Sequence, residues 1–136
     1  MIQHIPILLP PKPRGFHLIT EDIINGLGTL PNNGILHLFI QHTSAGILIN
    51  EAADPDVLID FEAIMNRIVP EDLPFLRHTL EGPDDMPAHV KSSIVGHHIS
   101  IPIINARLGL GTWQGIMLAE FRNRGGSRKV MATIFS

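Results

Sequence analysis

Cysteine is absent from this 136-residue chain, and charged residues are few. Without thiols, disulfides and thiolate ligands are excluded, so any transition-metal site must use His, Asp or Glu. Charged residues make up 17% of the sequence and hydrophobic residues 44%, and the formal net charge is -3. The ten Lys and Arg residues form no long cationic run that would attract phosphate backbones. We therefore expect no nucleic-acid partner.

Long apolar runs are missing as well. Stretches such as residues 5 to 9 are far too short to span a bilayer, and the N-terminus lacks the regions of a signal peptide. We expect a cytoplasmic protein with no membrane partner. The length predicts a single domain over residues 1–136. Because the apolar fraction is high for one small domain, we also expect apolar surface between subunits.

Proline and glycine divide the chain into short strands. Residues 35 to 42 have apolar side chains at both odd and even positions, which predicts a central strand covered on both faces. Residues 45 to 50 are the expected neighbouring strand. Gly125 and Gly126 predict a hairpin between the last two strands. The predicted strands cover residues 1–9, 15–19, 35–42, 45–50, 99–103, 112–122 and 129–135.

One main helix is predicted at about residues 54–69. Asp54 is suited to the N-cap and Pro55 to the first helical position, and apolar residues then recur at helical spacing up to Pro70. Thr20 is the expected N-cap of a short helix, and Pro87 the expected start of another that ends near residue 95.

The segment between these helices contains the first candidate site. His78, Asp85 and His89 offer two imidazoles and a carboxylate, which is a common open ligand set for zinc or a similar ion. Asp84 and Asp85 could instead cap the helix, because acids stabilise its positive N-terminal end. The free N–H groups at a helix start near Pro87 could also hold a phosphate or carboxylate.

A second group of polar residues lies on two strands. His42 is either a hydrogen-bonded core histidine or a proton carrier at the edge of a cavity. Thr43 and Ser44 add hydroxyl donors for an anion. Alternation along residues 112–122 places three further ligand-binding candidates on one strand face: Gln114, Glu120 and Arg122. Glu120 and Arg122 could instead form an ordinary surface ion pair.

Several motifs, in order, resemble the successive signatures of the YjbQ family, whose members are known as secondary thiamine-phosphate-synthase-like proteins. The resemblance runs from about residue 35 to the C-terminus. It rests on four main motifs: His42-Thr43-Ser44-Ala45-Gly46, Asp54-Pro55-Asp56-Val57, Gly82-Pro83-Asp84-Asp85-Met86-Pro87-Ala88-His89 and Gly111-Thr112-Trp113-Gln114-Gly115.

The resemblance implies an α+β domain built on a β-sandwich of mostly antiparallel strands, assembled as a homotrimer with polar pockets near subunit interfaces. It implies that His42, His78, Asp85 and His89 line the pocket, where a divalent metal such as zinc or magnesium, or an anion, is bound. No organic cofactor is implied. The activity attached to the family is a weak thiamine-phosphate synthase reaction, which is a poor guide to the native substrate.

Two functions are therefore expected. In the first, the chain is a transferase-like enzyme in which a metal held by His78, Asp85 and His89 polarises an oxygen of a small phosphorylated substrate. His42 would transfer a proton, with Asp85 and His89 as its catalytic partners. In the second, the chain is a non-catalytic module that binds a small anionic metabolite or a metal.

Overall fold

Eight strands in two antiparallel sheets form the framework of the computed structural model, which describes residues 1–136. The larger sheet has the order β1 (Ile2–Leu9), β8 (Arg128–Phe135), β3 (Asn33–Ile40), β5 (His98–Ile104) and β6 (Arg107–Leu108). The smaller sheet has the order β2 (Gly15–Leu18), β7 (Gln114–Glu120) and β4 (Ala45–Glu51). The predicted α+β class with mostly antiparallel strands is confirmed.

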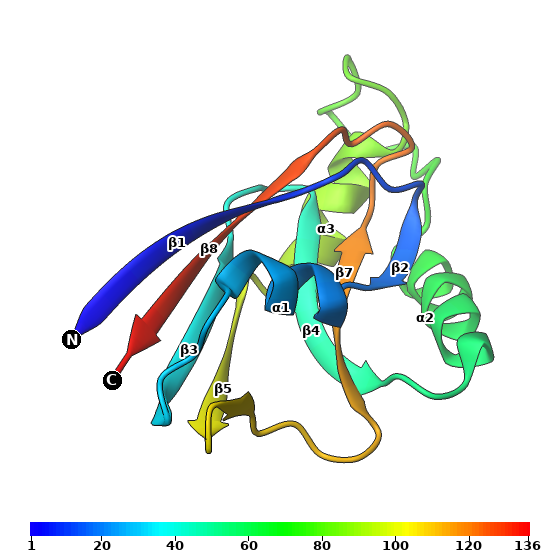
Figure 1. Cartoon of the computed structure of the whole chain (residues 1–136). Coiled ribbons are helices and arrows are strands. Elements are labelled where there is room, and N and C mark those ends of the chain that lie inside the picture. Colours follow the sequence, from blue (N-terminus) through cyan, green and yellow to red (C-terminus); the bar gives the residue numbers. More distant parts are fainter.

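The main core lies between the two sheets. Leu36, Leu38 and Ile40 alternate along β3 and are fully buried, and they belong to the same apolar cluster as Ile47 of β4 and Leu118 of β7. Helix α1 (Thr20–Leu27) adds two buried side chains to this cluster. Figure 1 shows α1 between the strands of the larger sheet and those of the smaller one.

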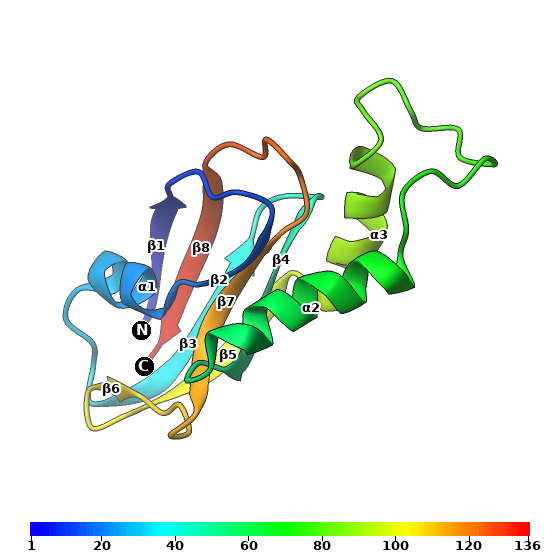
Figure 2. The same cartoon turned by 90° about the vertical axis from the view of Figure 1, so that its right-hand side faces the viewer.

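The other two helices cover the outer side of the smaller sheet (Figure 2). Helix α2 (Pro55–Ile68) contacts β2, and α3 (Asp85–Val95) contacts β4. The Asp54 carboxylate accepts a hydrogen bond from the Asp56 N–H at 2.9 Å, so the predicted N-cap of the main helix is confirmed. None of the three helices is long and apolar enough to cross a membrane.

Three local predictions are wrong. The last two long strands do not form a hairpin, because β7 belongs to the smaller sheet and β8 to the larger one, so Gly125 and Gly126 lie in a crossover between sheets. Strand β4 pairs with β7 and not with β3. Thr20 does not cap α1 either, since its hydroxyl accepts the Ile116 N–H at 2.9 Å and binds the helix to β7.

The predicted central strand is central, but only one of its faces is covered. Strand β3 pairs with β8 on one side and β5 on the other. Ile35 and Phe39, on the face away from the core, are 50% and 43% exposed. The expectation that both faces are covered is therefore wrong for the single chain.

Candidate metal centre

The start of α3 and the loop before it bring three candidate ligands together. Asp85 is the first residue of α3, and His89 follows four residues later, so both side chains lie on one face of the helix. His78 reaches the same carboxylate from the loop between α2 and α3. The residue types indicated this group, and the helix and loop now supply its geometry.

The ligand atoms converge on one carboxylate oxygen. His78 Nε2 lies 2.6 Å and His89 Nε2 lies 3.1 Å from Asp85 Oδ2, and the three atoms lie within 4.8 Å of one another. Tetrahedral bonds of about 2.0–2.2 Å to zinc place ligand atoms about 3.4 Å apart, so small movements that open these two hydrogen bonds would admit the ion. His89 Nδ1 donates to the Thr43 carbonyl at 2.9 Å, so its Nε2 is free to coordinate.

Arg122 holds the acidic side of the group in place. Its Nε donates to Asp84 Oδ2 at 2.9 Å, and its Nη1 donates to Asp85 Oδ1. Burial opposes ionisation of Asp85, but the His78 hydrogen bond and the charges of His89 and Arg122 outweigh burial and lower the pKa of the carboxyl. Asp85 is therefore a carboxylate at neutral pH, as metal binding requires.

Asp84 has a role that differs from the predicted cap. It is the N-cap residue of α3, but its side chain makes no capping bond. Oδ2 accepts from Arg122 and from the Asn123 N–H at 2.9 Å instead. Burial opposes ionisation, yet these hydrogen bonds lower the pKa of Asp84. The residue thus attaches the start of α3 to the segment that follows β7.

The helix start offers fewer anion donors than expected. Helix α3 begins at Asp85, two residues before Pro87, and proline has no N–H to donate. The N–H groups of Asp85 and Ala88 already donate to Gly82 and Asp84 carbonyls. An anion at this end would therefore meet few free N–H groups.

His42 is not linked to the cluster by any hydrogen bond in the single chain. Its Nε2 accepts the Lys129 N–H at 2.7 Å. Burial and the nearby Arg128 charge lower its pKa, so His42 is neutral at physiological pH. The neighbouring Thr43 is exposed, and its carbonyl oxygen also accepts the Ser92 hydroxyl at 2.7 Å. The proton-carrier role of His42 stays a prediction.

The other predicted anion-binding residues are divided between two places. Glu120 is fully buried and pairs with Arg128, whose guanidinium also donates to the Ser44 hydroxyl at 3.0 Å. The alternative Glu120–Arg122 ion pair is therefore wrong, since Arg122 pairs with the two aspartates. Gln114, at the opposite end of β7, accepts the Gly111 N–H at 2.8 Å.

Arg128 is a buried residue that sequence reasoning missed. The predicted strand began one residue later, at 129, although Arg128 continues the inward alternation of Val130 and Ala132. Its place in this alternation could have identified Arg128 as a buried residue, but arginine is usually found on the surface.

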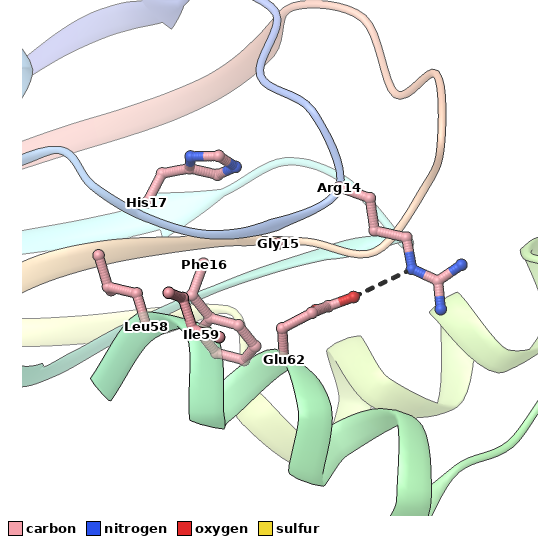
Figure 3. Close-up of a pocket in the computed structure, with 7 residues that line it drawn as sticks. All are labelled: Arg14, Gly15, Phe16, His17, Leu58, Ile59 and Glu62. Carbon is pink, nitrogen blue, oxygen red and sulfur yellow. Dashed lines mark hydrogen bonds and ion pairs between the residues drawn. The ribbon is translucent and has the colours of Figure 1, made fainter. Parts of the chain in front are cut away.

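A second buried polar network joins α2, α3 and the segment before β2. Asn66 Oδ1 accepts from Arg14 Nη2 and from Lys91 Nζ, both at 2.7 Å. Lys91 is 1% exposed, and burial lowers its pKa. Figure 3 shows the adjoining pocket of about 260 Å³, where Arg14 pairs with Glu62 at one end, Leu58 lies at the other and Phe16 lies between them. None of the predicted site residues lines it.

Two hollows give solvent access to the candidate metal ligands. His78 lines one of about 220 Å³, together with Leu73, Leu76 and other loop residues. His89 lines another of about 350 Å³, together with Thr43, His97 and two serines of α3. His97 therefore lines the same hollow as the candidate ligand His89.

Comparison with known proteins places the chain in a family. The family model described as "UPF0047 protein YjbQ-like" matches residues 6–136. The chain is 48% identical over 130 residues to the UPF0047 protein YjbQ of Salmonella typhimurium, with 94% of each chain covered. It is also 48% identical over 101 residues to a UPF0047 protein of Synechocystis, covering 74% of this chain and 69% of that one.

Solved structures show the same fold. A conserved hypothetical protein from Thermus thermophilus superposes with a TM-score of 0.81 at 34% identity, covering 94% of this chain and 97% of that chain. A YbjQ-like protein of Sulfolobus solfataricus has a TM-score of 0.84 at 22% identity, covering 98% and 96%, which supports the fold alone. The chain belongs to the YjbQ (UPF0047) family.

Proposed function

We propose that this protein is a small-molecule enzyme whose site holds a divalent metal ion through His78, Asp85 and His89. The observation that carries the proposal is the convergence of two Nε2 atoms on Asp85 Oδ2, at 2.6 and 3.1 Å. Two imidazoles and one carboxylate leave a coordination position open for substrate. Imidazole ligands favour zinc over magnesium.

Hydrogen bonds made by two of the ligands to the surrounding protein support the same conclusion. The Thr43 carbonyl fixes the ring of His89 through Nδ1, and Arg122 holds Asp85 through the other carboxylate oxygen. Such outer partners orient the ligands and maintain their protonation states. An unsupported surface cluster of two histidines and an aspartate would lack both contacts.

The substrate that fits best is a small phosphorylated or carboxylated molecule. A bound divalent ion would supply Lewis acidity toward an oxygen of the anionic group. Arg122 already pairs with Asp84 and Asp85, and no other arginine contacts the cluster. The metal ion would therefore be the main contact for the anionic group of the substrate. The reaction to test first is a group transfer that forms thiamine phosphate, with hydrolysis of small phosphate esters as the broader class.

Metal content tests the proposal directly. Protein stripped with a chelator and reloaded with zinc should hold about one ion per chain, measured by plasma mass spectrometry. His89→Ala should lose most of that ion and any turnover. His17→Ala, which removes a histidine bonded to the Pro13 carbonyl instead, is the matched control.

Equal metal content in the wild type and the His89→Ala protein, with folding verified by circular dichroism, would refute the proposed metal site. Normal turnover of the stripped protein would remove the proposed role of the metal.

A non-catalytic binding module is the second candidate, and one observation favours it. His42 Nε2 accepts the Lys129 N–H, so this atom is not available as a base in the single chain. If the metal-loaded protein binds phosphorylated metabolites tightly but turns none of them over, the module replaces the enzyme. His42→Asn separates the two functions, since it should retain metal binding and reduce only turnover.

A further inference from the structure

A third hollow lies outside the candidate metal centre. Its volume is about 450 Å³, compared with about 220 and 350 Å³ for the hollows beside His78 and His89. It is formed by α1, the segment that follows α1, the turn between β5 and β6, and the segment after β6. In Figure 2, α1 and β6 lie at the opposite end of the molecule from α3, which carries two of the candidate metal ligands. The hollow is therefore separate from the metal centre.

Aliphatic side chains form most of the wall of this hollow. Leu30, Leu108 and Leu110 are partly buried and pack against the main core cluster between the two sheets. Ile24 of α1 also lines the hollow and is 39% exposed. Water against such a wall is displaced favourably by an apolar group. The volume and the apolar lining are typical of a site for a small organic ligand.

Arg107 supplies the only charge among the residues that line the hollow. The arginines that pair with carboxylates in this chain are Arg14, Arg122 and Arg128, so the exposed Arg107 guanidinium has no counter-charge. Thr29 adds an exposed hydroxyl to the same wall. A guanidinium presents two parallel N–H donors, which match the two oxygens of a carboxylate. The hollow thus combines an apolar wall with one unpaired anion-binding group.

The turn that carries Arg107 has a defined backbone conformation. Asn105 and Ala106 join β5 to β6 and have positive φ angles of 52° and 61°. Asparagine tolerates this left-handed conformation, but it is unfavourable for alanine. The Ala106 N–H donates to the Asn32 carbonyl at 3.0 Å, which ties the turn to the segment after α1. Strained backbone that is held in this way is concentrated at ligand-binding sites, where it fixes the position of a binding group.

We propose that this hollow binds a small carboxylate with an aliphatic tail, as a second site that does not depend on the metal centre. The tail lies against Leu30, Leu108 and Leu110, and the carboxylate pairs with Arg107. One guanidinium balances the single negative charge of a carboxylate, whereas a phosphate monoester carries up to two charges at neutral pH. No Asp or Glu lines the hollow, so no side chain there repels the ligand.

Octanoate is the probe for this site. Isothermal titration calorimetry of the metal-loaded wild type should show saturable binding of octanoate. The affinity should rise by up to about fourfold for each CH₂ added between hexanoate and octanoate, which corresponds to about 0.8 kcal/mol per buried CH₂. 1-Octanol has the same tail without the charge and should bind about tenfold more weakly. Absence of octanoate binding at millimolar concentrations, or equal affinities for octanoate and 1-octanol, would overturn the proposal.

The role of the guanidinium is tested by removing its charge. Arg107→Gln should lower the affinity for octanoate about tenfold, the equivalent of one charge-assisted hydrogen bond that is partly screened by solvent. The affinity for 1-octanol should not change. Arg124→Gln is the matched control, because it removes an exposed arginine from the segment between β7 and β8. If Arg107→Gln binds octanoate as tightly as the wild type, the proposed recognition of the carboxylate is wrong.

Two further variants locate the ligand. Ile24→Trp fills the hollow from the exposed side of α1 and should abolish binding of both octanoate and 1-octanol, with folding verified by circular dichroism. His89→Ala removes a candidate metal ligand and should bind octanoate as the wild type does. Octanoate binding that survives Ile24→Trp, or that is lost in His89→Ala, would place the ligand elsewhere and would overturn the second site.

Discussion

Replacing Arg128 with leucine should be among the most destabilising single changes in this protein. The guanidinium donates to both carboxylate oxygens of Glu120 and also to the Ser44 hydroxyl. The side chains of Arg128 and Glu120 are 5% and 0% exposed. Arg128→Leu therefore leaves a carboxylate buried between the sheets without its counter-charge.

The magnitude follows from that burial. Removing one partner of a buried ion pair costs about 3–5 kcal/mol, because the remaining charge is uncompensated. For a domain of this length, about 1 kcal/mol corresponds to roughly 4 °C in Tm, so a decrease of about 10–20 °C is expected. Glu120→Leu combined with Arg128→Leu removes both charges and should be less destabilising than Arg128→Leu alone.

Urea unfolding at fixed protein concentration measures the effect. Arg124→Leu, which removes an exposed arginine from the segment between β7 and β8, is the control and should change the free energy of unfolding by less than about 0.5 kcal/mol. If Arg128→Leu stays within about 1 kcal/mol of the wild type, with Glu120 intact, the pair does not have the structural importance assigned to it.

Three further predictions concern packing, acid stability and assembly. Gly125→Ala should lower the Tm, because an added Cβ would lie 2.2 Å from Glu120 Oε1. Gly126→Ala should lower the Tm less, because the space around it is open, although its φ of +72° is strained for alanine. The lowered pKa of Asp85 means that its ionised form contributes stability above pH 4 that is lost as pH falls through its folded-state pKa, so Asp85→Asn should flatten this acid side of the stability profile. An unchanged acid slope would contradict that assignment. Light scattering at neutral pH should give about three times the 15.0 kDa mass of one chain, and a mass of one chain would refute the expected trimer.

Local chemistry in the sequence determined the elements themselves. Asp54 and Pro55 begin α2 because a carboxylate can cap free N–H groups and proline needs none, and these contacts involve residues two positions apart. Likewise, the inward positions of β3 follow from alternation alone. Asp85 and His89 were candidate ligands by residue type, but Pro87 between them argued against one regular helix, so only the structure shows that both lie on α3.

Tertiary structure decided everything that depends on which surfaces meet. Whether β8 joins β7 or β3 depends on which sheet buries its apolar face, and the turn between the last strands permits either arrangement. The partner of Glu120 was decided in the same way, since Arg122 and Arg128 are both near it in sequence but only Arg128 lies beside it in the core. His42 accepts a hydrogen bond from the Lys129 N–H, which lies 87 residues away in the sequence. Periodicity acts over a few residues, whereas these contacts are set by how the two sheets and three helices pack.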